Sequence, residues 1–245
     1  MPRGLWARLL LRSLLLQAAW NYRTLQGAGA AFVLLPLLRR LYPEPAALRL
    51  AVARHAGHFN AHPYLASLAL GSLARLEADG RDAETIRRFR VALGGPLGAL
   101  GDRLVWAAWL PLCAVLAVCL LLAGLAPVAV LASFLVLYNA GHVTLRAWGL
   151  AEGWAAGIGL AARLQTLALS RLATRVEGWL AGALGFLVGL GLAAPALSGE
   201  LPPVWGVLGA AALAAGMGAG PRLWRPAAVL TVGAVGLVLL SGFFL

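Results

Sequence analysis

The chain has 245 residues, of which 61% are hydrophobic and 12% are charged, with a mean hydropathy of +0.84. Soluble domains usually carry about 25% charged residues, so this composition excludes a soluble globular protein and indicates an integral membrane protein. The net charge is +11, and all 20 basic residues are arginine. The arginines flank apolar stretches and do not cluster with exposed aromatic residues, so we expect them to meet anionic lipid and not nucleic acid.

The first part of the chain, residues 1–103, is predicted to form amphipathic and re-entrant helices. Helical periodicity runs over 5–41 with a break at 26–29, and a second helical stretch follows from about 46 to 59, after a turn at 43–45. We expect no cleaved signal peptide, because polar residues interrupt the first apolar run.

Two further stretches complete this region. The apolar segment 64–76 is too short to cross a hydrocarbon core of about 30 Å, which favours a re-entrant or buried hairpin arm. The segment 77–90 is the most charged of the chain, and we expect it to be a cytoplasmic helix or loop.

The remaining residues, 104–245, are predicted to cross the membrane about five times. Stretches of about 20 apolar residues are long enough to cross, and the five predicted spans are 104–125, 128–145, 178–197, 204–220 and 226–245. Arginine-rich loops tend to be cytoplasmic. The arginine-free turns at 124–127 and 198–203 therefore face outward, and the C-terminus lies outside the cell. The fold class is thus an all-α polytopic membrane protein.

Four polar islands interrupt the apolar sequence, at 17–27, 58–64, 94–102 and 148–154. Polar groups and irregular backbone at membrane depth are tolerated where they are buried in protein or line a watery cavity. Amides and carboxylates bond sugar hydroxyls in pairs, and aromatic faces cover the apolar side of a pyranose ring. The predicted lining or gate of a sugar path consists of Asn21, Gln26, Asn60, His62 and Asp102.

Each island also has a purely structural interpretation. Gln26 and the glycines that follow it would then allow close helix packing. Asn60 would cap a helix with Pro63 at its first position, and Asp102 would pair with Arg103 at a membrane boundary. No metal, cofactor or catalytic residue is predicted. His58 and His62 have no third ligand nearby, and the glycine run at 94–101 lacks the Lys-Ser/Thr ending of a phosphate-binding loop.

The order and spacing of the islands resemble the IID component of the mannose/fructose/sorbose class of the phosphotransferase system. The matching motifs cover about two thirds of the chain: Leu16-Gln17-Ala-Ala-Trp20-Asn21-Tyr22 with Leu25-Gln26-Gly27, Leu38-Arg39-Arg40-Leu41-Tyr42-Pro43, Arg54-His55 with Phe59-Asn60-Ala61-His62-Pro63-Tyr64, Gly95-Pro96-Leu97-Gly98 with Gly101-Asp102 and Trp106, and Tyr138-Asn139 with Arg146-Ala147-Trp148-Gly149.

The resemblance implies a non-catalytic membrane subunit in the bacterial cytoplasmic (inner) membrane. Such subunits pair with a IIC subunit to form a permease channel, with several IIC–IID pairs around one axis. A hexose-type sugar crosses and is phosphorylated by a IIB component, which takes its phosphate from IIA.

Two departures from the family pattern support an alternative interpretation. Arg23 stands where an acidic residue is usual, and Leu110-Pro111 stands where Arg-Pro is usual. The chain would then be a transport-inactive structural or regulatory subunit. A stand-alone channel or secondary transporter is disfavoured because the chain shows no internal repeat.

Overall fold

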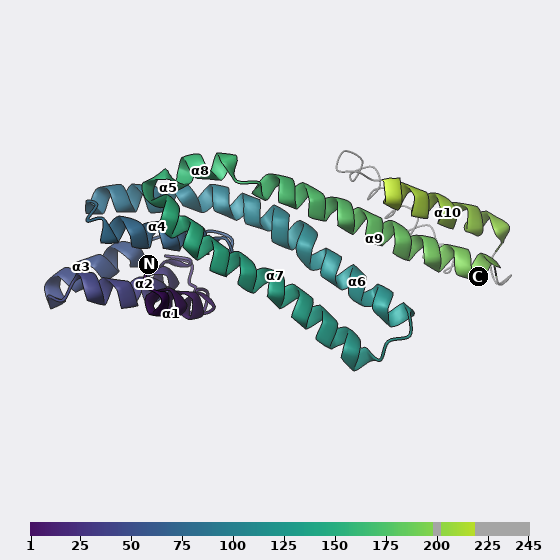
Figure 1. Cartoon of the computed structure of the whole chain (residues 1–245), viewed down its shortest axis with the longest axis horizontal. Coiled ribbons are helices and arrows are strands. Elements are labelled where there is room, and N and C mark those ends of the chain that lie inside the picture. The colour runs from purple at the N-terminus through teal and green to yellow at the C-terminus, as the bar shows by residue number, and fades with distance from the viewer. Residues whose placement is uncertain (198–201, 219–245) are drawn as a thin grey trace. The chain divides into compact units, whose positions relative to one another are not determined.

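The structure is a computed structural model that describes residues 1–197 and 202–218, and in that part of the chain it is helical apart from turns and isolated bridges (Figure 1). The elements are α1 (Arg3–Ser13), α2 (Gly27–Leu41), α3 (Pro45–Ala56), α4 (Ala66–Ala78), α5 (Ala83–Gly101), the π-helix η1 (Asp102–Trp109), α6 (Leu110–Leu122), α7 (Pro127–Ala156), the 3₁₀ turn η2 (Gly157–Gly159), α8 (Leu160–Thr166), α9 (Leu169–Leu197) and α10 (Pro203–Gly218).

The chain divides into two compact units. The first contains Met1–Asp102 and Asn139–Ala168, and the second contains Arg103–Tyr138 and Leu169–Leu245. The boundary between the units, at residues 102 and 103, lies one residue before the junction of the predicted regions 1–103 and 104–245, while 139–168 returns to the first unit.

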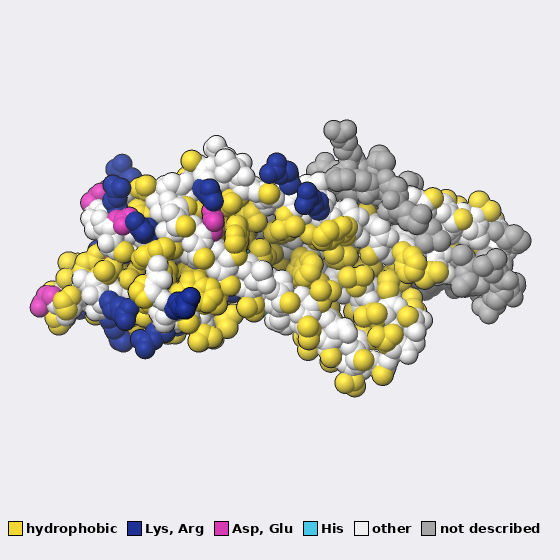
Figure 2. Space-filling view, in the orientation of Figure 1, with side chains coloured by type: hydrophobic (Ala, Val, Ile, Leu, Met, Phe, Trp, Pro, Cys, Tyr) yellow, Lys and Arg dark blue, Asp and Glu magenta, His cyan; other side chains and the backbone are white. Residues whose placement is uncertain are grey.

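Within the described residues, three helical segments are long and apolar enough to cross a membrane: Ala83–Leu122, Pro127–Thr166 and Leu169–Leu192. The prediction of an all-helical membrane protein is therefore confirmed. The predicted spans 104–125, 128–145 and 178–197 overlap these three segments, and 204–220 overlaps α10, whereas 226–245 lies outside the described residues. Large apolar side chains such as Leu121, Val128 and Val136 are exposed on these segments, where lipid can cover them (Figure 2).

Helices α5, η1 and α6 form one continuous helical segment, Ala83–Leu122, so the charged residues that follow position 82 lie on the same segment as the first candidate membrane span. Asp82 caps α5, because its side chain accepts a hydrogen bond from the Thr85 amide at 2.8 Å. A π-helical stretch ends at Trp109, two residues before Pro111, and such i→i+5 turns occur as bulges inside α-helices.

Helix α4 is the core of the first unit. Every residue from Ala66 to Ala74 is buried, in keeping with the buried alternative for the short apolar segment. Small residues allow backbone contact with α7: a Cβ added to Gly153 would lie 2.0 Å from the Leu68 oxygen, and one added to Gly71 would lie 2.3 Å from the Leu150 oxygen. Small residues serve this purpose in membrane helix packing generally.

The predicted helix break at 26–29 is wrong in position. Helix α1 ends at Ser13, residues 14–26 form turns and short bridges, and Gly27 and Gly29 lie in the first turn of α2. A Cβ on Gly29 would lie 1.8 Å from the Leu16 oxygen, and one on Gly27 would lie 2.0 Å from the Gly57 oxygen. These glycines therefore let backbone segments touch, as the close-packing interpretation expected.

The second unit is built by packing of α9 against α6 and α10. Arg103 joins the start of this unit to α9, because its guanidinium donates to the buried Glu177 carboxylate at 2.6 and 2.8 Å. The same group donates to the Thr174 hydroxyl at 2.9 Å. The predicted boundary ion pair between Asp102 and Arg103 is therefore wrong, since Arg103 is bonded to another carboxylate.

Candidate functional site

The loop 57–65 between α3 and α4 is held in place by the segment that precedes α2. The buried Gln26 amide donates to the Ala61 carbonyl at 2.7 Å and accepts from the Ala61 amide at 3.1 Å. Two backbone hydrogen bonds add to this pairing. The backbone amide of Gln26 donates to the Phe59 carbonyl at 2.9 Å, and the backbone amide of Phe59 donates to the Thr24 carbonyl at 3.2 Å. The first two polar islands thus form one structure.

Helix α5 packs against the same loop through two glycines seven residues apart, which places them on one helix face. A Cβ on Gly94 would lie 2.6 Å from the Asn60 oxygen. One on Gly101 would lie 2.2 Å from the Cβ of His62. The glycines of the third island therefore fit α5 against the loop of the second.

A stack of polar and aromatic side chains lies at the end of the loop. The buried His62 accepts a hydrogen bond from the Tyr64 amide at 3.3 Å, and its ring meets the Tyr64 ring edge-on at 5.1 Å. Tyr64 stacks on His142 at 4.4 Å, and the Arg146 guanidinium lies 5.0 Å from the Tyr64 ring centre. His142 also contacts the Asn139 side chain at 3.2 Å.

Burial and the charge of Arg146 lower the pKa of His62 to about 4. The imidazole is therefore neutral at physiological pH, and the lone pair of its Nδ1 accepts the hydrogen bond from the Tyr64 amide. A neutral ring in this place can orient a neighbour but carries no charge to attract an anion.

The five predicted site residues fall into two groups. Gln26 and His62 are buried, whereas Asn21, Asn60 and Asp102 are exposed. The loop brings Gln26, Asn60 and His62 together, and Asp102 follows the glycine that touches His62. The Asn21 side chain closes a local turn, accepting from Thr24 and donating to its hydroxyl at 2.9 Å.

The prediction that Asn60 caps a helix is wrong. Helix α4 begins at Ala66, and its N-cap residue, Leu65, makes no side-chain cap bond. Pro63 stands in the turn that precedes the helix. Pairing of the loop with the Gln26 segment keeps residues 59–61 extended, and this tertiary pairing delays the start of the helix.

Sequence reasoning missed the roles of Tyr64, Asn139, His142 and Arg146 as neighbours. A signal was present, because Asn139, His142 and Arg146 are spaced i, i+3 and i+7 and therefore share one face of α7. Tyr64 stood within the second island but was not singled out.

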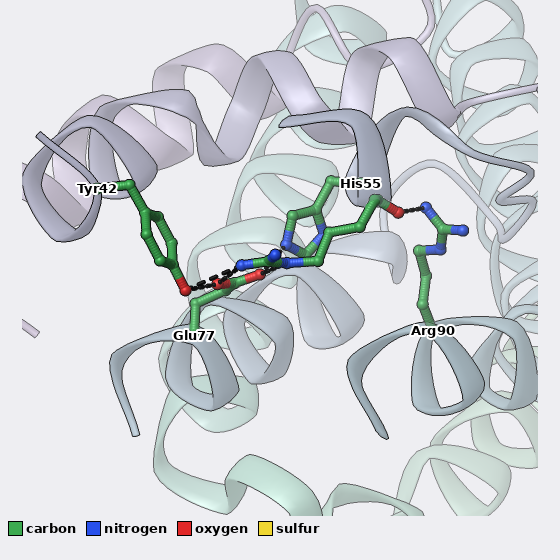
Figure 3. Close-up of polar contacts among 5 residues, drawn as sticks. Tyr42, His55, Glu77 and Arg90 are labelled. Carbon is green, nitrogen blue, oxygen red and sulfur yellow. Dashed lines mark hydrogen bonds and ion pairs between the residues drawn. The ribbon is translucent and has the colours of Figure 1, made fainter. Parts of the chain in front are cut away.

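Sequence reasoning also missed a cluster of polar side chains around a buried carboxylate (Figure 3). Glu77 on α4 is fully buried and accepts from Arg54 at 2.6 and 2.7 Å. It also contacts the His55 Nε2 at 2.6 Å and accepts from the Tyr42 hydroxyl at 2.7 Å. One carboxylate therefore ties α3 and the end of α2 to α4.

The protonation states in this cluster follow from burial and bonding. Burial alone would raise the pKa of Glu77, but the hydrogen bonds from Arg54, His55 and Tyr42 outweigh it and lower the pKa to about 2. Burial lowers the pKa of His55, although Glu77 opposes that shift. His55 is thus a neutral donor to the Glu77 carboxylate.

Arg90 on α5 extends this cluster toward the loop (Figure 3). Its buried guanidinium donates to the Arg54 carbonyl near the C-terminus of α3. A Cβ on Gly57 would lie 2.7 Å from the same guanidinium. The start of the loop is therefore packed directly against an arginine that caps α3.

This architecture defines a helical membrane protein in which three of the four polar islands meet at one packed loop, while the fourth packs against α4. The model of the family described as PTS system mannose/fructose/sorbose family IID component matches residues 4–221. The chain therefore belongs to that IID family.

Curated relatives agree with this assignment. The chain is 35% identical over 156 residues to the "PTS system mannose-specific EIID component" of Escherichia coli K12, covering 60% of this chain and 54% of the relative. It is 31% identical over 183 residues to the "Fructose permease IID component" of Bacillus subtilis, covering 73% and 64%. The chain spans about half the length of the first of these relatives.

Two solved structures are similar. One, titled "Structure of membrane protein", has a TM-score of 0.68 at 30% identity, covering 76% of this chain and 70% of that one. The other is a chain of the cryo-EM structure of the mannose transporter ManYZ in complex with microcin E492, with a TM-score of 0.60 at 25% identity, covering 98% and 97%.

Proposed function

We propose that this chain is the IID subunit of a sugar permease and forms the translocation path together with a IIC subunit. The observation that carries the proposal is the meeting of three polar islands, 17–27, 58–64 and 94–102, at the loop 57–65 of an otherwise apolar membrane protein. Relatives named as mannose and fructose components of the phosphotransferase system support it.

The residues divide into those that hold the loop and those that meet sugar. Gln26 already uses its amide on the loop backbone, and Asn21 uses its own in a turn, so both position the path. Asn60 and Asp102 are exposed, and we assign them direct contact with sugar hydroxyls. His62 orients Tyr64, whose ring stacks on His142 and therefore positions this end of the loop.

The proposed substrate is a hexose-type sugar, and the subunit itself performs no phosphoryl transfer. A IIB component, charged by IIA, phosphorylates the sugar as it leaves the path. The proposed assembly contains several IIC–IID pairs in the bacterial cytoplasmic membrane. The proposed topology has about five spans, with the arginine-rich loops inside and the C-terminus outside.

Substitution of Asn60 tests the assignment of the loop. Asn60→Ala, expressed with the IIC, IIB and IIA partners, is expected to lower hexose uptake about tenfold, because one substrate hydrogen bond is worth about 1.4 kcal/mol. Glu44→Ala is the control: Glu44 is exposed and makes no cap bond at the start of α3. Both variants should insert at the wild-type level, and wild-type uptake by Asn60→Ala would refute its role.

A transport-inactive subunit is the second candidate, and Arg23 and Leu110 motivate it. Arg23 is exposed in the turn closed by Asn21, where a family acid would place the opposite charge. If transport has been lost, the pair of changes Arg23→Glu and Leu110→Arg should create uptake from an inactive baseline. Robust uptake by the unmodified chain would exclude this candidate.

A further inference from the structure

Helices α1 and α2 pack together and line an open cavity rich in arginine. The cavity has a volume of about 460 Å³ and is lined by Arg8 and Arg12 from α1 and by Pro36, Arg39 and Arg40 from α2. Residues four positions apart share a helix face. Arg8 and Arg12 on α1 and Pro36 and Arg40 on α2 are such pairs, and both pairs line the cavity. Arginine side chains gather on the N-terminal helices beside apolar surface (Figure 2).

Pro36 gives this cavity a fixed wall. Proline has no amide hydrogen, so the carbonyl of Phe32, four residues earlier, has no donor within α2. Arg12 supplies the missing bond by donating to that carbonyl at 2.8 Å, and its guanidinium lies 4.4 Å from the Phe32 ring centre. Arg12 is therefore positioned before any ligand arrives, with donors left over.

The cavity contains no negative charge to balance its lining. Within residues 1–197 and 202–218, none of the four arginines forms an ion pair with a carboxylate. Arg12, Arg39 and Arg40 occupy last helical turns, where the helix dipole favours a cation, but Arg8 is in the middle of α1. Four like charges around one space repel, and a phosphate group can bond several guanidinium groups at once.

The surface beside the cavity is suited to acyl chains. Leu11, on α1 three residues after Arg8, is 65% exposed, and Leu15, in the turn that follows the helix, is 55% exposed. Phe32, under the Arg12 guanidinium, is also exposed. Helices that combine arginines with exposed leucines lie in the membrane interface, with the apolar side chains among lipid tails.

We propose that this cavity binds the phosphate of an anionic phospholipid whose acyl chains cover Leu11, Leu15 and Phe32. A soluble phosphate would satisfy the arginines alone, whereas a phospholipid satisfies the arginines and the leucines together. This site is separate from the loop 57–65 and does not depend on sugar transport.

The test measures lipid binding by the purified full-length chain, delipidated in detergent, with short-chain phosphatidylglycerol as the probe. The wild type is expected to bind it at least tenfold more tightly than phosphatidylcholine of the same chain length. Changing Arg8, Arg39 and Arg40 together to Gln should remove at least tenfold of that affinity. Arg12 is kept because it bonds the Phe32 carbonyl.

The matched control changes the exposed Arg23, Arg49 and Arg81 to Gln, which removes the same charge elsewhere. It should leave the affinity within twofold of wild type, and equal losses in both variants would overturn the site. The single variant Arg8→Gln, on the exposed face of α1, repeats the test if the triple variant does not remain monodisperse.

Inorganic phosphate distinguishes the source of the phosphate group. Failure of 10 mM inorganic phosphate to displace the bound phosphatidylglycerol supports the lipid assignment, in keeping with a contribution from the apolar surface. Displacement by inorganic phosphate, or equal binding of both lipids, would contradict it, the former favouring a soluble phosphorylated ligand.

Discussion

The Glu77 carboxylate is the most consequential single group in the first unit, and Glu77→Gln tests it. The substitution keeps the shape of the side chain and removes its charge. Arg54 then loses its counter-ion, and one of the two carboxylate oxygens becomes an amide nitrogen that cannot accept from Arg54, His55 or Tyr42. The ties from α3 and α2 to α4 should weaken together.

Two independent estimates of the cost agree. A carboxyl whose pKa is about 2 when folded and 4.5 when unfolded contributes about 3 kcal/mol at neutral pH. Removing one partner of a buried ion pair costs about 3–5 kcal/mol. Because the carboxylate of Glu77 binds fewer protons when folded, its contribution is present above about pH 4.5 and is lost as the pH falls toward 2.

Thermal unfolding in detergent, followed by tryptophan fluorescence, measures the effect. A loss of about 3 kcal/mol corresponds to a fall in Tm of roughly 6–12 °C for a chain of this size. Glu84→Gln is the matched control, since Glu84 also contacts two arginines, Arg87 and Arg88, but is exposed. The control should match the wild type, and a Tm for Glu77→Gln within 2 °C of wild type would refute the reasoning.

Three further changes probe the loop. Gly101→Ala should destabilise the protein by about 1–3 kcal/mol and lower uptake, because the new methyl group overlaps the His62 side chain. Gly98→Ala is the control, because its methyl group meets open space. Equal thermal unfolding and equal uptake in the two variants would count against the packing argument. Gln26→Ala leaves the Ala61 carbonyl and amide without partners and should lower the free energy of unfolding by roughly 2–4 kcal/mol, measured by thermal unfolding. Gln17→Ala, at an exposed glutamine, is the control. Equal unfolding of both variants would contradict the role of Gln26. The unfolded chain takes up a proton at His62 near pH 6.5 and the folded chain only near 4, so stability should fall on acidification through that window. His62→Asn should flatten part of this dependence of Tm on pH, and an unchanged slope would contradict the assignment.

The class of protein and the order of its family motifs could be predicted from the sequence, because the first depends on composition and the second on local spacing. The small share of charged residues predicted a membrane protein, and the short length of the segment 64–76 predicted a re-entrant or buried arm; α4, which forms there, is buried. The pairing of Pro43 and Pro45 predicted the turn between α2 and α3, where Pro45 opens α3. Family motifs predicted the IID assignment.

The rest depends on contacts between residues far apart in the chain. The partner of Gln26 is 35 residues away, and no local pattern predicts that its amide bonds a loop backbone. Glu77 begins the stretch 77–90, which was predicted from its charge to be a cytoplasmic helix or loop, yet Glu77 is buried on α4, where Arg54, His55 and Tyr42 bond its carboxylate. Glycine was similarly ambiguous, because the residues that predict a break also permit close packing, as Gly29 does in α2.

The most direct test of the central claim is to purify this chain together with a IIC subunit and measure binding of labelled hexoses to the complex. The proposed function predicts a stable pair that binds a hexose, with binding weakened by Asn60→Ala and unchanged by Glu44→Ala. A stable pair that binds no hexose would contradict the sugar path and favour a structural subunit. Absence of any stable pair would contradict the permease assembly itself.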